Sequence, residues 1–116
     1  MSVGRQMAVE AIRQHLLQSS ASLLVSNDAL GLALRRFFPE LKRAFVMNWI
    51  PEQGEDIYWV LVSSTEVAEI EIPRVIGAES NSPSLKIVAL DAYQKKRHSR
   101  DVRQRLKVGV ELIKSS

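Results

Sequence analysis

Residues 44–74, AFVMNWIPEQGEDIYWVLVSSTEVAEIEIPR, hold the clearest secondary-structure signal in the chain. Their pattern predicts three short strands, at 44–50, 57–62 and 67–72, which two turns connect. The middle strand is apolar on both sides of its alternation, as is typical of a strand that is covered on both faces. Gly54 can take the positive φ angle that a tight hairpin turn requires. We therefore expect an antiparallel three-stranded meander.

Strand alternation assigns the side chains of this meander to two faces. In the first strand we expect one face to carry Phe45, Met47 and Trp49, and the other to carry Val46, Asn48 and Ile50. In the third strand, one side carries Ala68, Ile70 and Ile72, and the other carries Val67, Glu69 and Glu71. The third strand should therefore have an acidic outer face. Pro73 should end it, because proline cannot donate a hydrogen bond to a sheet.

Helices and one further strand are expected on either side of the meander. Ser26, Asn27 and Asp28 are good helix-capping residues, and the helix after them should stop before Pro39. The other predicted elements are a helix over 3–18 that the serines of 19–22 interrupt, a fourth strand over 84–90, a short helix that Asp91 caps, and a helix over 100–114 that Ser99 caps. The alternative for the C-terminal part is a single helix from residue 91, kinked near residue 98. Residues 74–84 are expected to form a mobile loop.

Length and composition predict one α+β domain over residues 1–116, with an antiparallel sheet of three to four strands packed by N-terminal helices and a C-terminal basic helix. The chain is 46% hydrophobic and 25% charged, as globular proteins are. It contains no apolar run near the roughly 20 residues of a membrane helix and no secretory signal, so a cytoplasmic location without membrane contact is expected. The absence of cysteine excludes disulfides and thiolate sites.

Charge is distributed unevenly along the chain, whose net charge is +3. Residues 52–79 carry seven acidic side chains and one basic side chain, a net charge of −6. Residues 80–116 carry nine basic and three acidic side chains, a net charge of +6. Such asymmetry can steer an anionic partner to one end of the molecule, or draw opposite ends together within one chain or between chains.

The basic residues concentrate between residues 95 and 107. They are Lys95, Lys96, Arg97, His98, Arg100, Arg103, Arg105 and Lys107. Cations just before a helix start oppose the helix dipole unless an anion lies between them, which favours a phosphate-bearing ligand such as nucleic acid. The predicted anion-binding residues are Lys95, Lys96, Arg97, Arg100, Arg103 and Lys107, and Tyr93 could stack a base. The alternative is a solvated helix face that pairs with Glu66, Glu69 or Glu71 of this chain or a neighbouring one.

A second candidate site uses carboxylates of the meander. Glu69 and Glu71 share a face of the third strand, and Asp56 could approach them from the neighbouring strand to hold Mg²⁺. The arrangement resembles the acidic core of small restriction-type nucleases, in which an aspartate precedes a Glu-x-Lys strand. Glu71 stands where that lysine would be, so the residue that helps to activate water in that family is missing. The alternative is a solvent-facing strand whose charges discourage aggregation.

The third candidate is an aromatic partner surface that Trp49, Tyr58 and Trp59 would form if helices covered only one face of the sheet. No serine-nucleophile elbow, phosphate-binding glycine loop or paired histidines support catalysis, and no cofactor is expected. The sequence therefore favours a small non-enzymatic interaction or accessory domain that acts through self-association, as a homodimer, or through a protein partner. The alternative function is nucleic-acid binding through residues 95–107.

Overall fold

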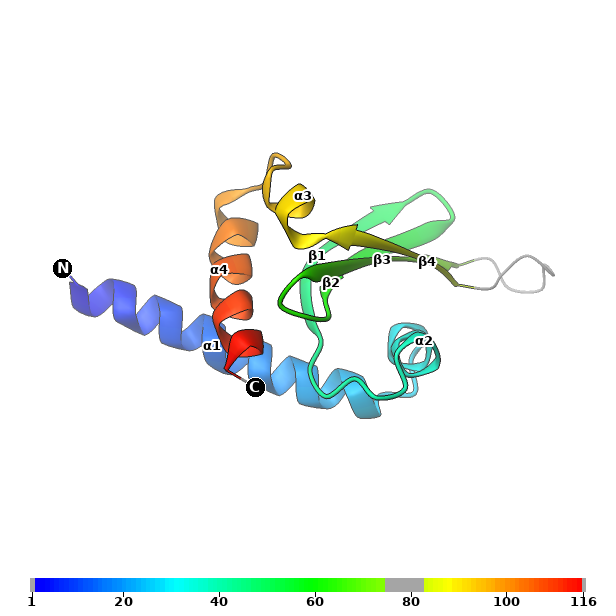
Figure 1. The fold of residues 1–116 in the computed structure, drawn as a ribbon, viewed down its shortest axis with the longest axis horizontal. Coiled ribbons are helices and arrows are strands. Elements are labelled where there is room, and N and C mark those ends of the chain that lie inside the picture. The colour runs from blue at the N-terminus through cyan, green and yellow to red at the C-terminus, as the bar shows by residue number, and fades with distance from the viewer. Residues whose placement is uncertain (1, 75–82, 116) are drawn as a thin grey trace.

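The computed structural model describes residues 2–74 and 83–115, with side chains from residue 8 onward. Within these ranges the chain forms an α+β fold in which a four-stranded antiparallel meander, ordered β1-β2-β3-β4, is packed by helices (Figure 1). The strands are β1 (Phe45–Glu52), β2 (Glu55–Leu61), β3 (Glu66–Pro73) and β4 (Ser84–Ala89). The predicted fold class is confirmed, and the fourth strand pairs with β3. The loop predicted over 74–84 falls largely on residues 75–82, outside the described residues.

The helices of the described chain are α1 (Ser2–Val25), α2 (Ala29–Phe37), α3 (Leu90–Gln94) and α4 (Arg100–Lys114). Two predicted caps are confirmed: Asp28 accepts a hydrogen bond from the Gly31 amide (2.8 Å), and Ser99 accepts one from the Val102 amide (3.2 Å). The C-terminal part forms two helices and not one. The predicted cap at Asp91 is wrong, because α3 begins at Leu90 and Asp91 therefore lies inside the helix. The capping position is Ala89, whose side chain makes no capping hydrogen bond.

Helix α1 is longer than the predicted 3–18, because two of the serines that were expected to interrupt it find hydrogen-bond partners. The Ser19 hydroxyl donates to the Leu16 carbonyl (3.2 Å), a bond that a serine inside a helix commonly makes. The hydroxyl of Ser20 is buried and accepts a hydrogen bond from the Ala44 amide (2.9 Å), just before β1. This bond fastens the C-terminal half of α1 to the start of the sheet.

A bulge in β1 changes the predicted distribution of side chains between the faces. Val46 lies opposite Val60, but Asn48 lies opposite Trp59, so Met47 has no cross-strand partner. Such an extra residue reverses the facing of every side chain that follows it. Trp49 therefore lies on the face opposite to Phe45, and the predicted common face of Phe45, Met47 and Trp49 is wrong.

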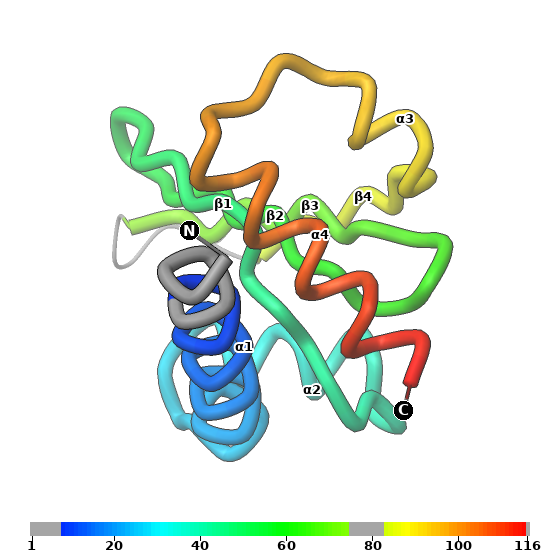
Figure 2. Tube along the Cα trace, turned by 90° about the vertical axis from the view of Figure 1, so that its left-hand side faces the viewer, coloured from blue at the N-terminus to red at the C-terminus, as the bar shows by residue number. Residues whose placement is uncertain are grey.

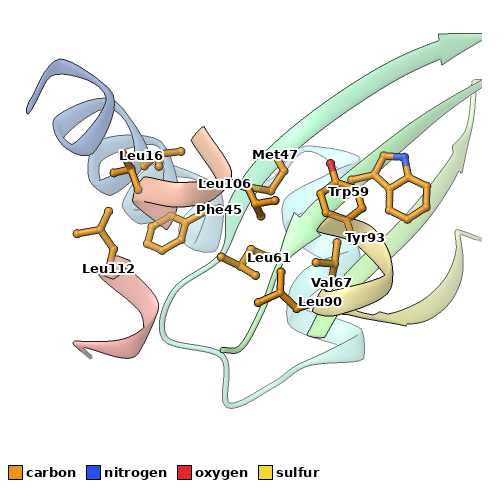
Figure 3. Packing of buried hydrophobic residues seen from close by; sticks show 11 residues of the cluster. Leu16, Phe45, Met47, Trp59, Leu61, Val67, Leu90, Tyr93, Leu106 and Leu112 are labelled. Carbon is orange, nitrogen blue, oxygen red and sulfur yellow. The ribbon is translucent and has the colours of Figure 1, made fainter. Parts of the chain in front are cut away.

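Helices pack on both faces of the sheet, and α1 joins the two layers by contacting α4, α2 and β1 (Figure 1, Figure 2). The α3–α4 face carries the cluster Leu16, Phe45, Met47, Trp59, Leu61, Val67, Leu90, Tyr93, Leu106, Val108 and Leu112, shown in Figure 3. The α2 face carries the cluster Leu30, Ala33, Leu34, Ala44, Val60, Val62, Ala68, Ile70 and Ile72. The strand predicted to be covered on both faces, β2, supplies buried residues to both clusters.

Candidate binding surfaces

The predicted anion-binding residues lie on two connected parts of the fold. Lys95, Lys96 and Arg97 belong to the loop that joins α3 to α4, and Arg100, Arg103 and Lys107 follow on α4, at spacings that place them on one side of the helix. All six are exposed. Figure 2 shows the loop above the sheet, on the side opposite to α2. His98 holds the loop to α3, because its Nε2 donates to the Tyr93 carbonyl oxygen (2.6 Å).

Few of these cations have a partner within residues 8–74 and 83–115. The Nζ atom of Lys96 lies 4.5 Å from the centre of a Trp59 ring. Arg105, which is half-buried, pairs with Asp101 (3.3 Å) and donates to the Met47 carbonyl (3.4 Å). Over the same residues, no ion pair or side-chain hydrogen bond involves the five remaining cations, which are Lys95, Arg97, Arg100, Arg103 and Lys107. Pairing with Glu66, Glu69 or Glu71 of the same chain is therefore not formed.

Tyr93 cannot stack a base, because its side chain is only 1% exposed. Its ring packs between Trp59, at 5.2 Å between ring centres, and His98, at 4.4 Å. Its hydroxyl has no hydrogen-bond partner among the described residues. Burial raises the pKa of Tyr93 to about 12, although the nearby Arg105 charge acts in the opposite direction. This burial has no signal in the sequence, because a tyrosine beside a basic run occurs equally on a surface.

The three aromatic residues predicted to bind a partner do not form one surface. Trp49 and Tyr58 stack at 6.2 Å between ring centres on the α2 face, and Trp49 is 54% exposed. The Trp49 indole N–H donates to Asp56 (3.1 Å), and burial, helped by the Asp56 charge, raises the pKa of Tyr58. Trp59 lies on the other face and is buried at 8% exposure, beneath Lys96. Of the three predicted residues, Trp49 and Tyr58 therefore lie together, and Trp59 lies apart from them.

The carboxylates predicted to bind Mg²⁺ are also on opposite faces. Asp56 lies opposite Ile72, whereas Glu69 and Glu71 lie opposite Trp59 and Ile57. Asp56 forms an ion pair with Arg74 (3.6 Å). Over residues 8–74 and 83–115, no group of three histidine or carboxylate side chains could hold a metal ion. The metal-dependent nuclease site is therefore not assembled in the described part of the chain.

In two hollows of the described surface, no hydrogen bond joins a nucleophile to a base. One, of about 460 Å³, is lined by His15, Asp28, Ser19, Ser22 and Ser26 at the end of α1. Asp28 caps α2, and no hydrogen bond joins His15 to any of these serines. The other, of about 380 Å³, lies between α1 and α4, where Val9 and Ile12 face Arg100 and Lys107. The residues around both hollows lack the hydrogen-bonded pairs that acid–base or nucleophilic catalysis requires.

Comparisons of the chain with protein-family models, curated proteins and solved structures gave no match. Within its described residues, no helix is long and apolar enough to cross a membrane. The function has to be inferred from the surfaces of the molecule itself.

Proposed function

We propose that the protein is a small non-enzymatic interaction domain that acts through self-association. One observation supports this proposal: most exposed cations of residues 95–107 and the glutamates of the sheet lie on different parts of the surface and form no ion pair with each other within the described part of the chain. The exposed cations of residues 95–107 have counterparts in Glu52, Glu55, Glu69 and Glu71 of the sheet, and no ion pair joins the two groups. Like charges that lie close together on a surface repel one another. A partner of opposite charge therefore lowers the electrostatic free energy of each surface when it binds.

The test of self-association is the molar mass of the protein in solution. Sedimentation velocity and light scattering would be run over a series of protein concentrations, at roughly 50 and 200 mM salt. We expect the mass to approach twice the 13.1 kDa of the chain at high concentration, and dissociation to be easier at the higher salt. A monomer at every concentration in the lower salt would contradict self-association.

A second candidate function is binding to the phosphate backbone of nucleic acid. It is favoured by Arg100, Arg103 and Lys107, which lie at helical spacing on the exposed side of α4 without ion-pair partners in the described chain. Tyr93 and Trp59 are buried, so they offer no platform for stacked bases. Contacts would then be made mainly to phosphates, and duplexes of different sequence should bind alike.

Fluorescence anisotropy of labelled DNA and RNA, single- and double-stranded, tests this second function at roughly 50 and 200 mM salt. The comparison is wild type with an Arg100→Glu/Arg103→Glu variant. Binding that is steeply weakened by salt and lost in the variant would support the nucleic-acid function. A control variant, Arg36→Glu/Lys42→Glu, changes the net charge equally at exposed positions outside α4. The second function is contradicted if no binding is detected at the lower salt.

A further inference from the structure

Four glutamates of the sheet lie on the same side of the molecule as the loop between α3 and α4: Glu52 is exposed, and Glu55, Glu69 and Glu71 are half-buried. Glu55, Ile57 and Trp59 alternate on β2, so Glu55 shares the face that packs on α3 and α4. The cross-strand partners of these residues carry the acidic side chains Glu52, Glu69 and Glu71 onto the same face, where the basic Lys86 of β4 lies opposite Glu69. We call these four glutamates the acidic sheet surface. Lys95, Lys96 and Arg97 are called the basic loop.

The two surfaces occupy opposite ends of this side. In Figure 1, α3 and the loop after it stand above one end of the sheet, whereas no described helix lies over the strands toward the β1–β2 turn. Lys96 marks the boundary, since its Nζ atom lies over Trp59, the cross-strand neighbour of Glu69. This side of the molecule is therefore uneven. The basic loop protrudes at one end, and the acidic sheet surface lies lower at the other end.

The shape and the charges of this side are complementary to those of a second copy of the chain. A twofold axis that runs across the strands would turn one molecule over and reverse its ends. The basic loop of each copy then meets the acidic sheet surface of the other, and the same contact is made twice. We propose that two copies associate in this way, face to face through their α3–α4 sides. This inference rests on the proposed self-association and names the surface that performs it.

Apolar side chains among the acidic residues would add to the electrostatic attraction. Ile57 is partly buried on the open half of this face, and Ile50, its cross-strand partner, is exposed. Covering both with the partner's raised end removes apolar surface from water. The opposite charges set the orientation and speed the encounter of the two copies. No other face of the described chain combines uncovered sheet, acidic residues and an adjacent basic loop.

Charge reversal in two separate variants tests the proposal. The acid-reversed variant is Glu69→Lys/Glu71→Lys, and the base-reversed variant is Lys95→Glu/Arg97→Glu. Each variant alone places like charges at both contacts, so we expect its dimer dissociation constant to rise by about tenfold or more. An equimolar mixture restores opposite charges at both contacts and should yield a heterodimer, which native mass spectrometry separates from either homodimer by mass. Formation of that heterodimer also proves that both variants are folded.

Matched controls reverse the same number of charges elsewhere. Glu40→Lys/Glu66→Lys and Arg36→Glu/Lys42→Glu change exposed side chains outside the two surfaces and should leave the dimer unchanged. A wild-type dimer that both reversed variants retain, or a mixture that stays monomeric, would overturn the proposed surface while self-association itself stands. Wild-type protein that is monomeric throughout would overturn both. Binding to nucleic acid by that monomer would then point to the second candidate function.

Discussion

The two faces of the sheet differ in which helices cover them and in what the rest of each face carries. On the α2 face, the short helix α2 lies across the middle of the strands, and Leu34 is fully buried there. On the α3–α4 face, the helices gather over one end, where the Tyr93 ring packs against Trp59 and His98 and its hydroxyl has no hydrogen-bond partner among the described residues. The other end of that face carries glutamates. The self-association proposed above uses the α3–α4 face, and the variants below compare the two faces.

The largest expected effect tests the packing of α2 on the sheet. Leu34→Ala removes a side chain that is 0% exposed and should lower the free energy of unfolding by about 2–5 kcal/mol. Leu32→Ala on the same helix is the control, because Leu32 is 51% exposed and its loss should cost well under about 1 kcal/mol. Urea unfolding of both variants gives the comparison. Similar losses of stability in the two variants would show that Leu34 is not packed between α2 and the sheet.

Gly31 and Gly109 lie on helices that pack on opposite sides of the sheet, and their replacement by alanine should affect stability differently. A Cβ atom on Gly31 would lie 2.7 Å from the carbonyl oxygens of Leu23 and Ser26, so α2 touches the end of α1 through backbone. Backbone cannot give way cheaply, and we expect Gly31→Ala to destabilise the fold by about 1–3 kcal/mol. The close approach also explains why a glycine is kept inside α2 despite its poor helix propensity.

On the α3–α4 side of the sheet, a Cβ atom added at Gly109 would contact side chains only. The nearest atoms to its new Cβ would be Cε of Met47 at 3.1 Å and Cδ2 of Leu61 at 3.3 Å. Methionine is flexible, and alanine gains about 1 kcal/mol over glycine within a helix, so the net change should stay within about 1 kcal/mol. The measurement is the denaturant midpoint of the two variants and of wild type. A loss of stability in Gly109→Ala as large as that in Gly31→Ala would contradict this prediction.

These contrasts also separate what the sequence predicts from what it does not. The caps at Asp28 and Ser99 and the meander follow from local signals, since a short polar side chain before an apolar periodic run acts within one turn. The bulge at Met47 has no such local signal, and it reverses the facing of Trp49. The extension of α1 likewise depends on Ser20 meeting the Ala44 amide, a residue far away in sequence. For the binding surfaces, the sequence identified the charged residues, but the separation of Asp56 from Glu69 comes from strand register.

A smaller effect is expected from the aromatic cluster of the α3–α4 face. Tyr93→Phe removes a buried hydroxyl that has no partner in the described chain, so stability at neutral pH should be equal to that of wild type or higher by about 1 kcal/mol. A loss of several kcal/mol would instead reveal a hydrogen bond to this hydroxyl.

The same variant gives a pH test with a defined sign. Burial raises the pKa of Tyr93 to about 12 in the folded chain, above its ordinary value of 10.0. The folded state therefore holds the proton when the unfolded state has lost it, so this contribution is complete below about pH 10 and falls as pH rises toward 12. Thermal unfolding across that interval should show a steeper loss of stability for wild type than for Tyr93→Phe. Parallel curves would contradict the raised pKa.

The smallest expected effect concerns Trp49, and it tests the division of roles between the faces most directly. Trp49 is exposed and stacks on Tyr58, which are features of a residue that anchors a protein interface. It lies on the α2 face, however, whereas the proposed dimer forms through the α3–α4 side. Trp49→Ala should therefore change the dimer dissociation constant by less than about twofold, with Leu32→Ala as a second exposed control on that face. If Trp49→Ala abolishes the dimer while Glu69→Lys/Glu71→Lys does not, self-association would have to be reassigned to the α2 face, and the exposed indole would become its centre.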